Sequence, residues 1–130
     1  MLINRQSPFF DKGAAYKLYK QYEKEIDYPD GFEDLTNRDS FYNVYEDGKF
    51  VGCVFVYKAI DGKNYLGGYA NRGMHHQSVR AVCELCKNYE LLYSETPHLN
   101  AVICLKKAGF EWLNREKNLL IWRKKYGKIC

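Results

Sequence analysis

The sequence predicts an α/β fold (α+β), a mixed central sheet of about six to seven strands with helices on both faces. The chain has 130 residues, which fits a single domain over residues 1–130 and leaves no room for a second core. Hydrophobic residues make up 46% and charged residues 28%, as in an ordinary folded domain. Segments with helical and with strand periodicity alternate along the chain, a pattern typical of a sheet covered by helices.

The first half predicts a short strand, a helix and three further strands. The apolar residues 2–3 suit the short strand. Apolar side chains then recur at three- and four-residue steps over 15–26, which predicts an amphipathic helix with Asp11 as its N-cap. Residues 28–38, which include Pro and Gly, are expected to form a loop. The next strands are expected at 41–45, 50–57 and 65–70, with turns at 46–49 and 61–64.

The second half predicts two helices and three strands. After Gly73, apolar residues share one helical face and predict a helix of about twelve residues. Pro97 opens the second helix, and Gly109 ends it where a left-handed residue is needed. The apolar face of the first of these helices comprises Val79, Val82, Cys83 and Cys86. The strands are expected at 91–93, 110–114 and 119–123.

Charge is divided unevenly along the chain. Residues 1–50 hold ten acidic and seven basic side chains, whereas residues 51–130 hold six acidic and thirteen basic ones. The second half is therefore where an anion such as a phosphate is expected to bind.

The cysteines indicate a reducing compartment. Their number is odd, no signal peptide is recognisable, and they stand in apolar stretches, so reduced thiols in the cytoplasm are expected. They are Cys53, Cys83, Cys86, Cys104 and Cys130. No apolar run approaches the roughly 20 residues that cross a bilayer, so no membrane partner is expected.

The junction between the strand at 65–70 and the helix after it has the composition of an anion site. The N–H groups and positive dipole end of a helix start attract anions, and small residues before it let a ligand approach the main chain. Arg72 adds a positive charge. A glycine-tolerant turn with a bulge is the alternative interpretation. The junction matches neither the P-loop nor the dinucleotide glycine pattern.

A known family shares the segment that follows. A short strand at 91–93 precedes a helix that ends in Gly109-Phe110, with Ala101 eight residues before the glycine. This segment resembles the GCN5-related N-acetyltransferase (GNAT) family, and the order of elements agrees with that family over nearly the whole chain. The resemblance implies acetyl transfer from acetyl-CoA to an amine, with the pyrophosphate at the junction. The cofactor-binding residues it implies are Leu66, Gly68, Tyr69, Ala70, Arg72, Gly73, Met74, His75, His76, Gln77, Ser78, His98 and Asn100.

Several positions depart from the family pattern. With Arg72 in the first position of the pyrophosphate loop, His75 and Gln77 stand where small residues are usual, so the loop is degenerate. Leu105 stands where many members carry a tyrosine that protonates the leaving thiolate, and His98 stands where an asparagine is usual.

The same resemblance implies candidates for the catalytic groups. A base would remove a proton from the ammonium form of the acceptor, and Glu95, His75 and His76 are expected near the cleft, with Glu95 and His75 as the candidate bases. Because the usual tyrosine is missing, Tyr93 is the candidate acid. Helix capping or a surface position for either histidine, and a loop position for Glu95, are the alternatives.

Three further hypotheses belong to other classes. The first is a non-catalytic protein that retains this fold, as small stand-alone bacteriophage proteins can, and acts in assembly or protein interaction, with a second copy of itself or an assembly partner. A nucleic-acid module is the second, because a basic run lies near the end of the chain, although a solvated edge also explains that run. The run consists of Arg115, Lys117, Arg123, Lys124, Lys125 and Lys128.

A zinc site is the third hypothesis, and helix geometry argues against it. His76 and Cys83 on one helix would lie about 10 Å apart, since the rise is about 1.5 Å per residue. Ligands of one zinc ion lie within about 4 Å of each other. No metal site is expected, and Cys83 and Cys86 are expected to face the sheet.

Overall fold

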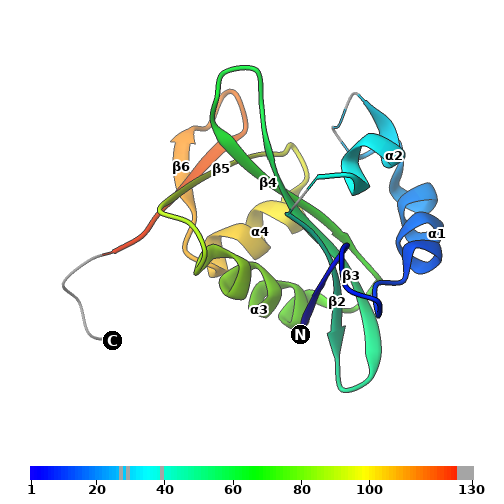
Figure 1. Cartoon of the computed structure of the whole chain (residues 1–130). Helices are drawn as coiled ribbons and strands as arrows, with labels where there is room; N and C mark the ends of the chain where they lie inside the picture. The colour runs from blue at the N-terminus through cyan, green and yellow to red at the C-terminus, as the bar shows by residue number, and fades with distance from the viewer. Residues whose placement is uncertain (27, 29, 39, 126–130) are drawn as a thin grey trace.

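A seven-stranded sheet forms the centre of the computed structural model, which describes residues 1–26, 28, 30–38 and 40–125 (Figure 1). The strand order is β1-β2-β3-β4-β5-β7-β6, and β4 and β5 form the parallel pair between two antiparallel groups. The strands are β1 (Leu2–Asn4), β2 (Ser40–Glu46), β3 (Lys49–Lys58), β4 (Asn64–Ala70), β5 (Leu91–Glu95), β6 (Glu111–Asn114) and β7 (Leu119–Arg123). The predicted mixed sheet is confirmed.

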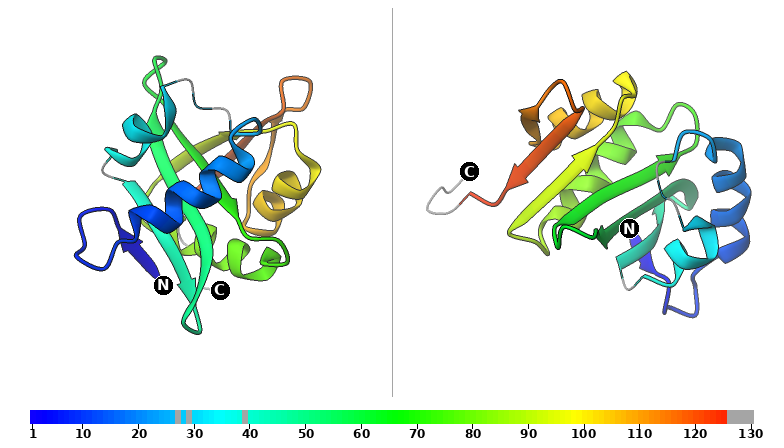
Figure 2. Two further views of the ribbon diagram at one scale, coloured as in Figure 1. Left: turned by 90° about the vertical axis from the view of Figure 1, so that its right-hand side faces the viewer. Right: turned by 90° about the horizontal axis from the view of Figure 1, so that it is seen from above.

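Helices cover both faces of this sheet (Figure 2). They are α1 (Lys12–Tyr22), α2 (Gly31–Thr36), α3 (His75–Cys86) and α4 (Leu99–Lys107). The first two pack on one face, and α3 and α4 pack on the other. Strand β3 faces both layers, because Cys53 and Phe55 pack on the α1 side and Val54 and Val56 on the α3 side. Its continuous apolar sequence follows from burial on both faces.

Helix α1 begins as predicted and ends earlier than predicted. The Asp11 carboxylate accepts a hydrogen bond from the Ala14 N–H at 2.9 Å, so the predicted N-cap is confirmed. The helix was expected to reach Ile26 but ends at Tyr22, whose carbonyl accepts hydrogen bonds from the N–H groups of both Glu25 and Ile26. Ile26 still packs against the α1 side of the core, which explains why the apolar period continued.

The expected loop at 28–38 contains α2, so that part of the prediction was wrong. The helix has six residues, too few to show a helical period in the sequence. It begins at Gly31, whose φ of +82° favours glycine. Phe32 and Leu35, three positions apart, bury the inner side of α2 against the sheet.

The cysteine prediction needs one correction. Cys86 is buried in the core, but Cys83 is exposed, because the buried side of α3 runs through Ala81, Val82 and Leu85. Cys83 follows the buried Val82 in the chain and points away from that side of the helix. The described cysteines, which also include Cys53 and Cys104, are unpaired. Cys130, Lys128 and Tyr126 lie outside the described residues.

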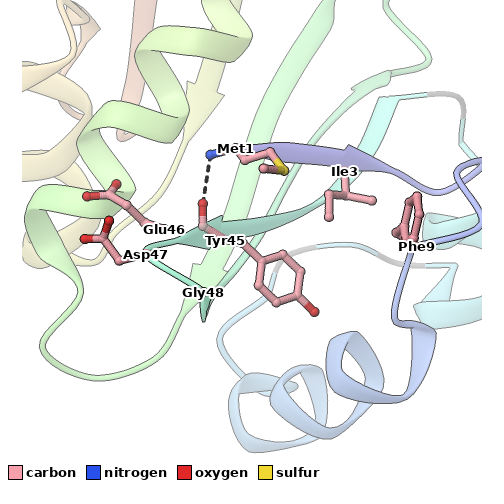
Figure 3. A pocket seen from close by; sticks show the side chains of 7 residues that line it. All are labelled: Met1, Ile3, Phe9, Tyr45, Glu46, Asp47 and Gly48. Carbon is pink, nitrogen blue, oxygen red and sulfur yellow. Dashed lines mark hydrogen bonds between the residues drawn. The ribbon is translucent and has the colours of Figure 1, made fainter.

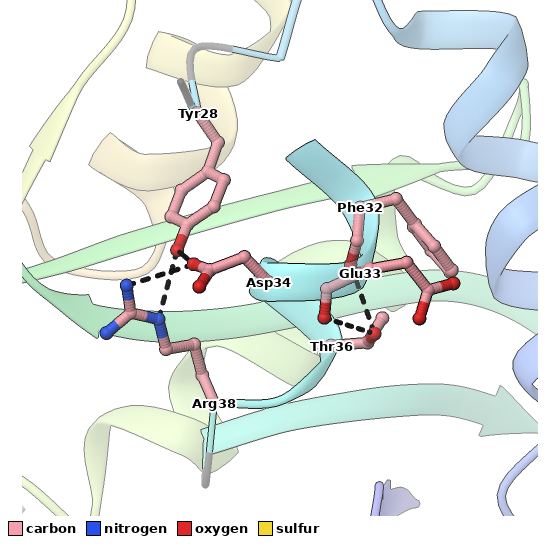
Figure 4. Close-up of polar contacts among 6 residues, drawn as sticks. All are labelled: Tyr28, Phe32, Glu33, Asp34, Thr36 and Arg38. Atoms are coloured by element: carbon pink, nitrogen blue, oxygen red, sulfur yellow. Dashed lines mark hydrogen bonds and ion pairs between the residues drawn. The ribbon is translucent and has the colours of Figure 1, made fainter. Parts of the chain in front are cut away.

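A polar network fixes α2 to the chain around it (Figure 4). The Tyr28 hydroxyl donates a hydrogen bond to the Asp34 carboxylate, and Arg38 donates to both residues at 3.0 Å. Burial, with the bond to Asp34 second, raises the pKa of Tyr28 to about 12. The bond from Tyr28, with Arg38 assisting, lowers the pKa of Asp34 below its ordinary 3.8.

The hydrogen bonds to Asp34 are expected to make part of the free energy of unfolding depend on pH. A carboxyl whose pKa is lower in the folded state stabilises it above the unfolded pKa, and this contribution disappears as pH falls through the folded pKa. Urea unfolding should therefore show Asp34→Asn to be less stable than the parent chain at pH 7, with the difference shrinking below pH 3.8. A difference that does not change between pH 7 and pH 3 would contradict this contribution.

Candidate functional site

Strands β4 and β5 part soon after they meet. They share one register pair, Tyr65 with Tyr93, at the start of β4. Beyond it, the Ser94 hydroxyl donates a hydrogen bond at 2.9 Å to the buried carbonyl of Leu66. The side chain thus takes a carbonyl that a continuous parallel ladder would pair with an N–H. The gap between the two strands begins at this bond.

Ser94→Ala is expected to lower the free energy of unfolding by about 1–3 kcal/mol, because it leaves the buried Leu66 carbonyl without its partner. Chemical denaturation measures the effect. Ser78→Ala is the matched control, since the Ser78 hydroxyl bonds to the Met74 carbonyl within its own helix and alanine favours helices. Equal stability of the two variants would show that the Ser94 bond contributes nothing.

A cavity of about 930 Å³ occupies the gap. Its lining includes residues of both core faces, such as Val54 and Val82 from the α3 side and Phe55 and Tyr69 from the α1 side. The cavity therefore passes through the sheet between β4 and β5. Twelve residues that the sequence singled out line it: Leu66, Gly68, Tyr69, Ala70, Arg72, Gly73, Met74, His75, Ser78, Glu95, His98 and Asn100.

Three other candidates are not among the lining residues. His76 is exposed and Gln77 is partly buried, both in the first turn of α3. Tyr93 packs against the Tyr65 ring at 5.8 Å, and the Lys63 ammonium lies 4.9 Å from its ring centre. The structure therefore does not bring Tyr93 into the cavity.

The junction at the start of α3 carries the features that attract an anion. In the described part of the chain no side chain caps α3, and its first turn holds no acidic residue. Gly73 has a φ of +83°, so this turn favours glycine. Arg72, His75 and His98 line this end of the cavity. The donor set suits a phosphate group such as the pyrophosphate of coenzyme A.

Solved structures share this fold. Campylobacter jejuni N-acetyltransferase PseH in complex with acetyl coenzyme A superposes with a TM-score of 0.65 at 13% identity, over 96% of this chain and 99% of that one. Aminoglycoside acetyltransferase AAC(6')-Ib with coenzyme A and kanamycin gives 0.59 at 18% identity, over 88% and 92%.

The chain has the GNAT fold. In a second structure of AAC(6')-Ib, with coenzyme A, it spans 65% of that chain and 65% of its own length, with a TM-score of 0.50 and 21% identity. No family model matches the sequence, and no curated protein matches it.

Within this GNAT fold, the candidate catalytic groups have distinct surroundings. Glu95 is exposed at the end of β5 and lines the cavity. The Lys107 ammonium lies 3.2 Å from the His75 Nε2, to which it donates when the ring is neutral. A base at His75 would therefore have to release this bond. Leu105 is buried in the α3 side of the core and supplies no proton.

The sequence did not single out four residues at the other end of the cavity. Tyr22 is the last residue of α1, Glu25 and Ile26 follow that helix, and Tyr57 comes from β3. Their place depends on how α1 packs across β3 and β4, a contact between distant segments that no local motif marks.

A separate pocket of about 400 Å³ lies at the β1 edge of the sheet (Figure 3). The amino group of Met1 donates to the Tyr45 carbonyl at 2.8 Å beside it. Its lining is Met1, Ile3, Phe9, Tyr45, Glu46, Asp47 and Gly48. No residue of this pocket lines the cavity between β4 and β5, so the two are separate places.

Two kinds of site are absent from the described residues. None of the helices there has the length and apolar character needed to span a membrane. No three His, Cys, Asp or Glu side chains in that part of the chain come together in a way that could hold a metal ion.

Proposed function

We propose that this chain is an N-acetyltransferase of a single domain, which moves the acetyl group of acetyl-CoA to an amine in the cytoplasm. The observation that carries the proposal is the cavity through the sheet, which begins at the uncapped start of α3 and opens where β4 and β5 part. A helix start and a nearby arginine suit the pyrophosphate, and the volume of about 930 Å³ suits an extended ligand.

The chemistry needs only a few groups of this chain. Glu95 would take a proton from the ammonium form of the acceptor, so that the nitrogen lone pair can attack the thioester carbonyl carbon. A carbon–nitrogen bond forms, the carbon–sulfur bond breaks, the nitrogen loses its second proton to water, and the thiolate takes up a proton from water. A backbone N–H of β4 at the gap would stabilise the negative charge on the carbonyl oxygen. The products are the N-acetyl amine and coenzyme A.

Calorimetry with acetyl-CoA and with desulfo-CoA tests the proposal. Arg72→Ala is expected to raise the Kd for acetyl-CoA about tenfold or more, because a hydrogen bond to a charged group contributes about 1.5–3 kcal/mol. Arg80→Ala, in the helix that follows Arg72, is the control: Arg80 pairs with the Glu46 carboxylate and does not line the cavity. Its Kd should change less than about twofold.

Absence of heat with either ligand at millimolar concentration would contradict the proposal and favour a non-catalytic interaction protein with this fold. Binding that is weakened equally by both substitutions would place the coenzyme elsewhere on the basic surface.

A further inference from the structure

The cavity differs at its two ends. Arg72, His75 and His98 line the end at α3 and α4. The carboxylates in its lining are Glu25 and Glu95, and both belong to the other side. Glu25 follows α1 on the α1 side of the sheet. Glu95 lies on the same face of β5 as Tyr93, because side chains two residues apart in a strand share a face.

Gly67 lets the Phe55 ring lie close to β4 on the α1 side of the cavity. It lies between Tyr65 and Tyr69 on the same face of β4. A Cβ at Gly67 would come within 2.6 Å of the Phe55 ring, so the strand has no room for a larger residue there. The floor of the cavity at this point is backbone and aromatic ring.

Aromatic rings form a continuous row beside the α1 side of the cavity. Tyr57 lies 5.3 Å from the Tyr28 ring and 5.9 Å from the Tyr65 ring, to which it is nearly parallel at 19°. Tyr65 continues the row to Tyr93 at 5.8 Å. Of these four, Tyr57 lines the cavity, together with Tyr22 at the end of α1 and Ile26 after it. A rigid row holds the Tyr57 ring in place, so its surface is preorganised for a flat ligand.

We propose that the acceptor is a primary amine carried on an aromatic ring system, an inference that rests on the proposed acetyl transfer. The ring of the acceptor lies against Tyr57, Tyr22 and Ile26, and its ammonium lies at the Glu25 and Glu95 end of the cavity. An aminosugar fits less well, because its many hydroxyl groups need a matching set of polar side chains, and this end is lined mainly by rings and aliphatic groups.

The first test is binding of tryptamine, with spermidine and glucosamine as the competing chemical classes, by calorimetry on the intact protein with coenzyme A present. Tryptamine is expected to bind at least tenfold more tightly than either. Tighter binding of spermidine would show that charge alone selects the acceptor, and tighter binding of glucosamine would show a sugar site. Either result, or no tryptamine binding at millimolar concentration, overturns the inference.

Paired variants test which residues hold the ring and the ammonium. Tyr57→Leu should weaken tryptamine binding at least fivefold, whereas Tyr45→Leu, outside both the row and the cavity lining, should not. Glu25→Gln should also weaken tryptamine binding at least fivefold. Glu23→Gln should not, because the Glu23 carboxylate pairs with Lys20 and does not line the cavity. Equal effects within each pair would overturn the inference.

The same titrations separate this inference from the proposed function. Acetyl-CoA that binds while tryptamine does not leaves the acetyltransferase proposal intact and removes the aromatic acceptor. Tryptamine that binds while acetyl-CoA does not has the opposite meaning: the aromatic amine site stands and the acetyl transfer fails.

Discussion

Gly52→Ala is expected to lower the free energy of unfolding by about 3 kcal/mol, the upper end of the usual range for overpacking. Gly52 faces Ala70 across the β3–β4 ladder. A Cβ there would lie 2.2 Å from the Tyr69 carbonyl oxygen and 2.6 Å from the Ala70 Cα. Both are backbone atoms, which cannot turn away as a flexible side chain can, so the two strands must move apart.

Gly13→Ala is the matched control for this substitution. Gly13 lies in the first turn of α1, and its nearest neighbour to a new Cβ is the Asp11 carboxylate oxygen at 3.4 Å, an ordinary contact. Alanine stabilises a helix relative to glycine by up to about 1 kcal/mol, so this variant should be more stable than the parent chain. Urea denaturation of both variants measures whether the free energy of unfolding falls in Gly52→Ala and rises in Gly13→Ala. Two substitutions of equal effect would contradict the close β3–β4 contact.

Gly52→Ala should also affect the cavity. Gly52 and Ala70 both line it, and they adjoin the junction that carries Arg72. Separation of β3 and β4 would displace the end of β4 and with it the candidate phosphate site. We expect weaker acetyl-CoA binding in Gly52→Ala even where the variant is still folded.

The sheet and most helix limits could be predicted because their signals are local. Alternating apolar residues and turn residues placed the strands, and Asp11 marked the start of α1 by its own hydrogen bond. Gly109 has a φ of +106°, as expected of a residue that ends a helix in the left-handed region. The junction before α3 also follows from local composition, since Gly73 and Arg72 are neighbours in the chain.

What could not be predicted depends on contacts between distant segments. Helix α2 is too short to show a period, and it is held by Tyr28 and Arg38, which precede and follow it. The exposure of Cys83 depends on the angle at which α3 meets the sheet, which periodicity fixes only to within one residue. The lining by Tyr22 and Glu25 arises only after α1 packs across β3 and β4.

The division of the core into two clusters separates the two ends of the cavity. One cluster fixes α3 and α4, whose starts carry the candidate phosphate site, and the other fixes α1, whose end carries Tyr22 and Glu25. Damage to one cluster should therefore alter one end of the cavity before the other. Substitutions at one fully buried residue of each cluster test this.

Phe41→Ala is expected to lower the free energy of unfolding by about 3–5 kcal/mol, the range for removing a buried phenylalanine side chain. The Phe41 side chain is fully buried in the α1 cluster. Its ring stacks on the Phe55 ring at 5.6 Å and meets the edge of the Phe10 ring at 6.0 Å. Alanine leaves a cavity and breaks both ring contacts in the cluster against which α1 packs, so α1 should be held less firmly on the sheet.

Leu85→Ala is the counterpart in the other cluster, where Leu85 is equally buried, and it is expected to cost about 2–5 kcal/mol. Hydrogen exchange distinguishes the two variants: Phe41→Ala should speed exchange in α1 more than in α3, and Leu85→Ala should do the reverse. The same pair should weaken tryptamine and acetyl-CoA binding respectively, because each ligand would depend on a different helix. Equal acceleration in α1 and α3 in both variants would show that the clusters open as one unit, and the two ends of the cavity would then depend on a common core.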